Sequence, residues 1–180
     1  MGVCINLIQV ILLFIHQSAI LTGNKGIYVG DRGFDRGKII SDMIENDISF
    51  IFRGDERNLL IKGRNLSYKE IAKRTNYKAV SKNHTFKENI VEVGFKLPNS
   101  PDRKHQKKRI AKLYLVIANE KNRRYVYHLC HFRKDYSFEE IIQMAIQYCG
   151  IRWGTEEVHR YKGRHKKYYL EKMQLVLLLN

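Results

Sequence analysis

Apolar residues at the start of the chain follow two alternating patterns. Leu7 to Leu21 is apolar almost all round a helix, which is typical of an element buried between layers. Ile27 to Val29 lies between glycines and predicts a buried strand that stops at Gly30 and Asp31. Phe34 to Asn46 has helical spacing, and Ile48 to Arg53 predicts a second strand. Strand, helix and strand in this order form a βαβ unit, so the sequence predicts an α/β fold.

The middle of the chain changes to short strand patterns separated by polar, basic loops. The predicted strands are Leu59 to Lys62, Ile90 to Leu97, Leu113 to Ala118 and Arg124 to His131. Capping boxes at Ser67 with Glu70 and at Ser137 with Glu140 predict a short helix and a long helical stretch from Phe138. The apolar run Leu175 to Leu179 is typical of the start of another helix.

These patterns divide the chain into three predicted parts. Residues 1–57 form part of an α/β core, residues 58–132 a β-rich insertion, and residues 133–180 the C-terminal helices. A chain of 180 residues that is 44% hydrophobic is long enough to bury a core, which excludes a wholly disordered protein and a small disulfide-stapled scaffold.

Charge points to an anionic partner. The chain has 33 Lys and Arg against 18 Asp and Glu, a formal net charge of +15. Such an excess is typical of nucleic-acid binding. The three cysteines, Cys4, Cys130 and Cys149, are odd in number and scattered, so we expect no disulfide framework and a cytoplasmic location.

Two weaker signals leave alternatives open. Val3 to Ile15 is apolar, but it is shorter than the ~20 residues of a spanning helix, so a buried helix is favoured over a signal peptide or anchor, and we expect no membrane partner. His128 and Cys130 would share one face of a strand beside His131, where ordinary packing is favoured over a metal site because no second ligand pair at zinc spacing follows.

Two carboxylates are the candidates for catalysis. Asp31 comes at the tip of a buried strand, where α/β folds bind ligands, and Glu156 or Glu157 falls in the C-terminal helical region. Tyr148, Arg152 and Glu156 follow at steps of four and so share one helix stripe. The alternatives are structural: Asp31 as a turn residue or helix cap, and Arg152 with Glu156 as an exposed ion pair.

At this point the residues resemble a known family. The segments Gly26 to Phe34 and Tyr148 to Arg160 look like those of bacterial insertion-sequence DDE transposases, of the insertion-sequence-four type with a Tyr…Arg…Glu…Lys signature. The resemblance implies an RNase H-like core, incomplete at its N-terminus, with a β-rich insertion between the second and third acidic residues. Asp31 would be the second acidic residue and Glu156 the third.

The same resemblance implies a reaction and its partners. Asp31 and Glu156 would bind two Mg²⁺ or Mn²⁺ ions, and Tyr148 and Arg152 would contact the phosphate beside the scissile bond. The substrate would be double-stranded DNA, as element ends and as target, cleaved and then joined by strand transfer. A homodimer in the DNA complex is a further possibility that the resemblance raises.

The sequence also departs from the family pattern. No residue before Asp31 is acidic, so the family's first acidic residue is missing. Three residues rather than two separate Tyr148 from Arg152, and five rather than six separate Glu156 from Lys162. Lys162 would lie about 120° from Glu156 around a helix. We therefore expect a truncated transposase that is inactive alone, with a non-catalytic DNA-binding remnant or an inhibitor of an intact transposase as the alternative.

Two basic clusters are the candidates for DNA contact, against the alternative of solvated charged loops. With Tyr148 and Arg152, the DNA-binding candidates are Lys104, Lys107, Lys108 and Arg109 in the first cluster and Arg160 and Lys162 in the second.

Overall fold

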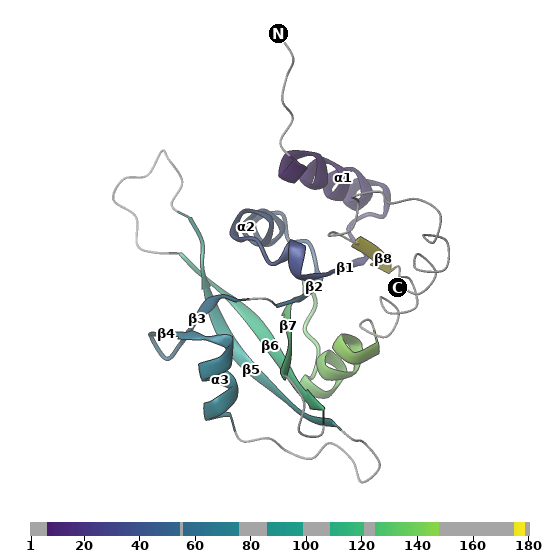
Figure 1. The fold of residues 1–180 in the computed structure, drawn as a ribbon. Coiled ribbons are helices and arrows are strands. Elements are labelled where there is room, and N and C mark those ends of the chain that lie inside the picture. The colour runs from purple at the N-terminus through teal and green to yellow at the C-terminus, as the bar shows by residue number, and fades with distance from the viewer. Residues whose placement is uncertain are drawn as a thin grey trace, which may run out of the picture.

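The computed structural model describes residues 7–54, 56–75, 86–98, 109–120, 125–147 and 175–178, and these form one mixed sheet with helices on its faces (Figure 1). The strands are β1 Ile27–Gly30, β2 Phe50–Arg53, β3 Asn58–Ile61, β4 Arg64–Ser67, β5 Phe86–Lys96, β6 Ile110–Glu120, β7 Tyr125–His131 and β8 Leu175–Leu178. The helices are α1 Leu7–Leu21, the short 3-10 helix η1 Arg32–Phe34, α2 Gly37–Glu45, α3 Tyr68–Arg74 and the helical segment 138–147. The predicted α/β class is confirmed.

The predicted βαβ unit is present. β1 and β2 are parallel neighbours, with Tyr28 opposite Phe50, and η1 and α2 connect them. A single helix from Phe34 to Asn46 was the expectation, whereas η1 ends at Phe34 and α2 begins at Gly37. The break occurs because Arg36 adopts an extended backbone, with φ −111° and ψ 129°, before the helix starts.

All the strands of the described residues join one sheet in the order β4, β3, β5, β6, β7, β2, β1, β8. Apart from β1 with β2, neighbouring strands are antiparallel. β7 pairs directly with β2, so that His131 lies opposite Phe50. The strands predicted as an insertion therefore extend the same sheet as the βαβ unit, and the division into three parts stays a prediction.

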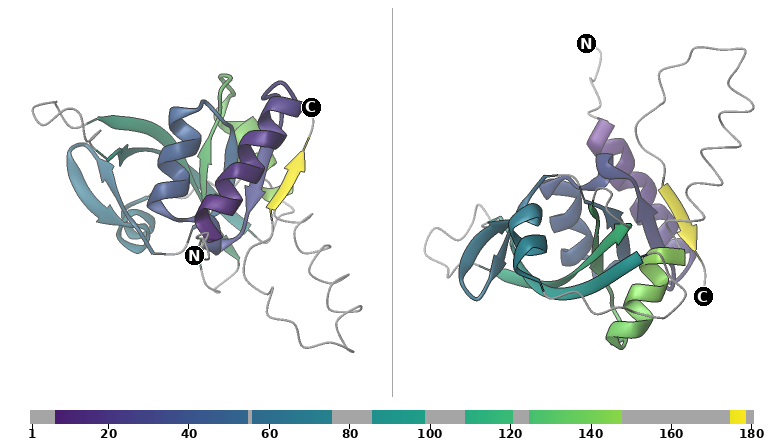
Figure 2. Two further views of the ribbon diagram at one scale, coloured as in Figure 1. Left: turned by 90° about the horizontal axis from the view of Figure 1, so that it is seen from above. Right: turned by 60° about the horizontal axis from the view of Figure 1, so that its bottom comes forward.

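Both faces of the central strands β1 and β2 are buried. Alternate residues of β1 point to opposite faces, with Tyr28 in the core under α1, α2 and α3. Val29 lies in the core under the helical segment 138–147, against Ile141 and Ala145. Figure 2 shows α1 and α2 side by side on one face and the segment 138–147 on the other. The result is a layered α/β arrangement that leaves the ends of the central strands to carry a site.

Two strands differ from expectation. Leu175–Leu178 forms β8, antiparallel to β1, where the apolar run suggested a helix. Pairing satisfies the backbone groups along the outer edge of β1, and this overrides the local preference. β4 was not predicted: it forms a hairpin with β3 through Lys62 and Gly63, which both have positive φ, at 47° and 79°. A two-residue turn of that kind matches the twist of the strands.

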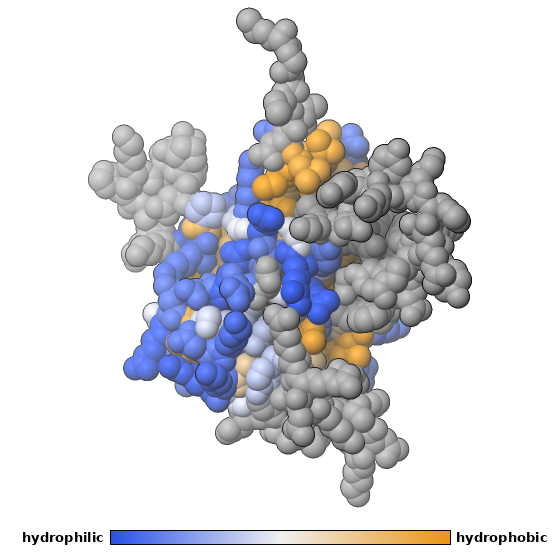
Figure 3. All heavy atoms as spheres, in the orientation of Figure 1, coloured by the Kyte–Doolittle hydropathy of each residue, from blue (hydrophilic) through white to orange (hydrophobic). Residues whose placement is uncertain are grey.

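α1 is buried on one face only. Ile15 and Ala19 face the core, whereas the opposite side is open, which corrects the expectation of a helix covered all round. The exposed apolar side chains of this helix are Leu7, Val10, Leu13, Phe14, Ile20 and Leu21, and Figure 3 shows an apolar patch there. Among the described helices, none is long and apolar enough to cross a membrane.

Candidate functional site at the carboxyl end of β1

Asp31 lies where the chain leaves β1, directly after Gly30. The neighbouring strand β2 runs parallel to β1 and ends at Arg53. Polar residues that follow or end the two strands therefore lie at the same edge of the sheet. This is the edge at which open α/β sheets bind ligands. The predicted position of Asp31 is therefore confirmed, and Arg32 and Arg53 are brought to the same edge.

The Asp31 carboxylate has a local structural task. Its Oδ1 accepts a hydrogen bond from the Gly33 N–H at 2.8 Å and thereby caps η1. The cap fixes the direction in which this partly buried side chain leaves the strand. The alternative interpretation of Asp31 as a helix cap is confirmed.

Gly30 lets the turn fold back onto the strand. A Cβ at this position would lie 2.7 Å from the Phe34 ring. Phe34 is buried and packs against Phe52 of β2, with ring centroids 5.5 Å apart. The absence of a side chain at Gly30 thus permits Phe34 to anchor η1 in the core, and this anchoring positions Asp31 at the sheet edge.

A buried polar cluster that the sequence analysis missed lies one turn further on. Asp35, whose side chain is 1% exposed, accepts from Arg57 Nε at 2.6 Å and from the Tyr68 hydroxyl at 3.1 Å. Arg57 Nη2 also donates to the Asp35 carbonyl at 2.8 Å. Burial and the neighbouring Asp35 charge raise the pKa of Tyr68, so its hydroxyl stays protonated and donates.

The cluster joins the βαβ unit to the rest of the sheet. Asp35 follows η1, Arg57 lies just before β3, and Tyr68 begins α3. Gly54 permits the close approach of α3, because a Cβ there would lie 2.6 Å from the Tyr68 ring. Spacing gave no signal for this contact, since its three members are scattered over more than thirty residues. We assign it a positioning role, holding α3 beside the carboxyl end of β2.

Asp31 is the predicted metal ligand that lies among the described residues. Within the described ranges, no group of three or more His, Cys, Asp or Glu could hold a metal ion. Both carboxylate oxygens of Asp35 are engaged by Arg57 and Tyr68. Mg²⁺ commonly takes one or two protein carboxylates and completes its shell with water and substrate phosphate. Asp31 fits that pattern as one oxygen ligand.

Most other predicted site residues lie in parts of the chain outside the described ranges. Those outside the described residues are Glu156, Tyr148, Arg152, Lys162, Arg160, Lys104, Lys107 and Lys108. Arg109 is described: it donates to Glu45 Oε1 at 3.0 Å, in a half-exposed ion pair. Glu45 ends α2, which leads back toward the start of β2, so the structure does not bring Arg109 to Asp31.

The strand residues His128 and Cys130 are packing residues. Both are buried, and the Cys130 thiol donates to the His128 carbonyl at 3.6 Å. Cys130 lies in the core that faces the segment 138–147. His131 points to the other face and packs against Phe50, with ring centroids 5.6 Å apart. In this part of the chain the favoured packing interpretation agrees with the geometry.

Comparison with family models, curated proteins and solved structures finds no match to this chain. The α/β class therefore rests on the structure itself, and the functional assignment rests on the site and the sequence motifs.

Proposed function

We propose that this chain is part of a DDE-type DNA transposase with an RNase H-like core, which cleaves element ends and transfers strands into target DNA with divalent metal ions. The observation that carries the proposal is the place of Asp31: it follows the first strand of a parallel βαβ unit, capped and held at the ligand-binding edge. The formal charge of +15 supports DNA as the partner.

The roles of the residues follow from phosphodiester chemistry. Asp31 and Glu156 would hold Mg²⁺ or Mn²⁺, which when bound polarises the phosphate and stabilises the charge of the attacking and leaving oxygens. Asp31 is oriented for this by η1, so little freedom is lost on binding. Tyr148 and Arg152 would bind the phosphate beside the scissile bond, Arg152 through paired charge-assisted hydrogen bonds.

A non-catalytic DNA-binding remnant, or an inhibitor of an intact transposase, is the second candidate. One observation favours it: the cap that Asp31 forms on η1 already accounts for this residue structurally. In that case the chain would bind DNA through charge alone, and Asp31 would hold no metal. The homodimer and the cytoplasmic location stay predictions of the sequence.

The variant Asp31→Asn separates these functions, because an amide oxygen can still cap η1 while the ligand charge is lost. The matched control is Asp47→Asn, which removes an exposed carboxylate paired with Arg133 at 3.2 Å. The measurements are Mn²⁺ binding by electron paramagnetic resonance, nicking of supercoiled plasmid with Mg²⁺ or Mn²⁺, and duplex binding in EDTA.

The proposal expects the wild-type chain and Asp47→Asn to bind Mn²⁺ with DNA present, and Asp31→Asn to bind at least tenfold more weakly. Nicking that disappears in Asp31→Asn identifies the enzyme. DNA and Mn²⁺ binding without nicking overturns catalysis by this chain alone and supports a transposase part that is inactive alone. DNA binding without Mn²⁺ binding favours the remnant. Equal Mn²⁺ binding by wild type and Asp31→Asn overturns the metal role, and no DNA binding overturns both candidates.

A further inference from the structure

A small basic pocket adjoins Asp31. It has a volume of about 260 Å³ and lies among the carboxyl end of β2, the beginning of β7 and one face of α3. Four cationic side chains line it: Arg32, Arg53, Lys69 and Lys73. Arg32 is the residue directly after Asp31, so the pocket opens one residue from the candidate metal ligand.

The cations converge from separate elements. Arg32 belongs to η1 and Arg53 ends β2, while Lys69 and Lys73 are four residues apart on α3 and therefore share one face. Tyr68, Ile71 and Ala72 occupy the opposite, buried face of α3, which orients the two lysines outward. The Asp35 cluster, through Tyr68, thus also holds the lysines in place.

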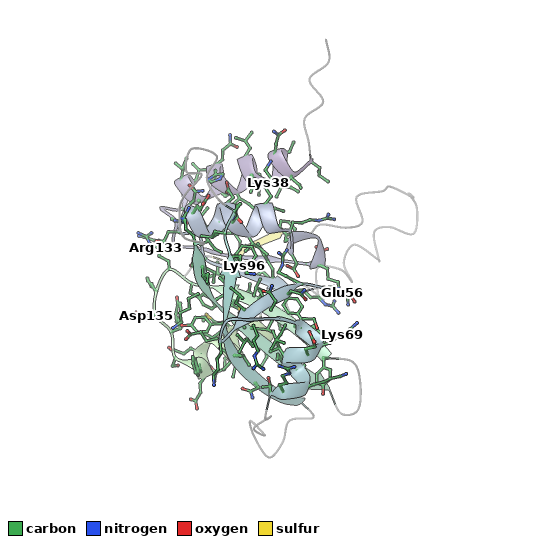
Figure 4. The ribbon with its side chains drawn as sticks, turned by 90° about the vertical axis from the view of Figure 1, so that its left-hand side faces the viewer. Lys38, Glu56, Lys69, Lys96, Arg133 and Asp135 are labelled. Carbon is green, nitrogen blue, oxygen red and sulfur yellow. The ribbon has the colours of Figure 1, made fainter. Side chains whose placement is uncertain are left out.

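Glu56 is the acidic residue that lines this pocket, and its ion pair is weak. Glu56 pairs with Lys69 at 3.1 Å, but the two side chains are 76% and 68% exposed, and exposed pairs contribute at most about 1 kcal/mol. Figure 4 shows Glu56 and Lys69 together at the edge of the molecule. Among the described residues, Arg32 and Lys73 form no ion pair. An incoming anion can therefore replace Glu56 at little cost.

Aromatic rings form a firm wall of the pocket. Tyr125 and Tyr127 line it, with ring centroids 6.3 Å apart, and Tyr127 stacks on Tyr68 at 5.3 Å. Tyr127 is almost fully buried, and Gly54 N–H donates to its carbonyl at 2.8 Å. Cations arranged beside flat aromatic surfaces are typical of grooves that follow a nucleic-acid backbone.

A second, larger cavity differs from the basic pocket in its charged lining. This groove of about 720 Å³ lies between α2 and β5, and its charged lining consists of Lys38, Arg57 and Lys96 with Asp42 and Glu45. Figure 4 labels Lys38 and Lys96. The mixed lining of this groove gives no preference for an anion. The basic pocket is smaller than the roughly 300–1,000 Å³ of small-molecule sites, a size that suits a phosphate group and its sugar.

We infer that the basic pocket of Arg32, Arg53, Lys69 and Lys73 binds backbone phosphate of DNA and directs the strand past Asp31. The inference rests on the proposed function, since it names where the DNA substrate would lie. It adds a contact surface on α3 that neither of the two basic clusters of the sequence contains.

The test is the double variant Lys69→Gln with Lys73→Gln, against a control that removes the same charge elsewhere, Lys25→Gln with Lys134→Gln. Lys25 precedes β1 and Lys134 follows β7, so the control pair lies toward the amino ends of β1 and β2, away from the pocket. Fluorescence anisotropy measures the Kd of a 20-base-pair duplex in EDTA from 50 to 400 mM salt. Circular dichroism verifies the fold of each variant.

The loss of two phosphate contacts reduces the slope of log K against log salt concentration by about 1.8 and weakens DNA binding by about 10- to 60-fold at 0.1 M salt. The control double variant weakens DNA binding less than threefold. Equal losses in the two double variants overturn the pocket assignment but leave the proposed function standing. Failure of wild type to bind DNA at all overturns the proposed function itself. Inorganic phosphate at matched ionic strength distinguishes the source: low millimolar phosphate binding that the Lys69→Gln, Lys73→Gln variant loses while its duplex Kd stays that of wild type identifies a free-phosphate site and overturns the DNA assignment.

Discussion

Replacing Arg57 by methionine should destabilise the protein strongly. The substitution keeps much of the side-chain volume but leaves the Asp35 carboxylate, 1% exposed, without the guanidinium 2.6 Å away. Breaking a buried ion pair by removing one partner costs about 3–5 kcal/mol, because the remaining charge is buried without its opposite charge. The total stability of a domain is only about 5–15 kcal/mol, so the loss is a large fraction of it.

Urea denaturation followed by circular dichroism and tyrosine fluorescence measures the effect. With a slope of about 1–3 kcal/mol/M, Arg57→Met should lower the midpoint by at least about 1 M. The matched control is Lys112→Met, which breaks the pair with Glu92 at 2.7 Å. Both partners are more than half exposed there, so less than about 1 kcal/mol is expected.

A double variant measures how much of the loss comes from the Asp35 carboxylate that Arg57→Met leaves without its guanidinium partner. Asp35→Asn combined with Arg57→Met leaves a neutral amide at the Tyr68 hydroxyl and should recover at least about 1 kcal/mol relative to Arg57→Met alone. Equal midpoint shifts for Arg57→Met and Lys112→Met would contradict the conclusion that the cluster of Asp35, Arg57 and Tyr68 is a buried contact that joins the βαβ unit to α3.

Three further predictions concern single side chains. Tyr68→Phe should lower the free energy of unfolding by about 1 kcal/mol at pH 7, because the hydrogen bond to Asp35 is lost. The pKa of Tyr68 is raised in the folded state, so above pH 10 the unfolded tyrosine ionises first and wild type loses about 1.4 kcal/mol of stability per pH unit. The difference in stability between wild type and Tyr68→Phe should therefore narrow above pH 10. Burial lowers the pKa of His131, so wild type should lose stability as pH falls below about 6.5. In His131→Phe the melting temperature should change less between pH 7 and pH 5 than it does in wild type. Melting temperatures that fall in parallel in the two proteins would contradict this prediction. Gly30→Ala should lower the free energy of unfolding in urea by about 1–3 kcal/mol, because its Cβ would displace Phe34 and η1. The same displacement should weaken Mn²⁺ binding. Unchanged Mn²⁺ affinity would show that η1 does not position the metal site.

The elements that the sequence predicted well are those with a complete local signal. Ser67 and Glu70 form the expected capping box, with the Glu70 carboxylate accepting from the Ser67 N–H at 2.8 Å, and α3 begins where it predicts. The same holds at Ser137 and Glu140, before the segment 138–147. Hydrogen bonds between near neighbours depend little on the rest of the fold, so pattern alone locates them.

The missed features depend on contacts distant in sequence. β8 forms because the outer edge of β1 pairs with Leu175–Leu178, which its leucine-rich composition alone did not indicate. Asp35, Arg57 and Tyr68 meet only after the βαβ unit and α3 have packed together. For Lys69 and Lys73, helical spacing predicted a shared face but not its partners Arg32 and Arg53, which the parallel pairing of β1 with β2 supplies.

The most direct test of the central claim is Mn²⁺ binding at Asp31 in the DNA complex, measured by electron paramagnetic resonance on the whole chain. We predict that Asp31→Asn weakens Mn²⁺ binding at least tenfold, while melting temperature and duplex affinity in EDTA stay within error of wild type, because the amide still caps η1. Undiminished Mn²⁺ binding by Asp31→Asn would contradict a metal site at Asp31 and leave this residue as a structural cap.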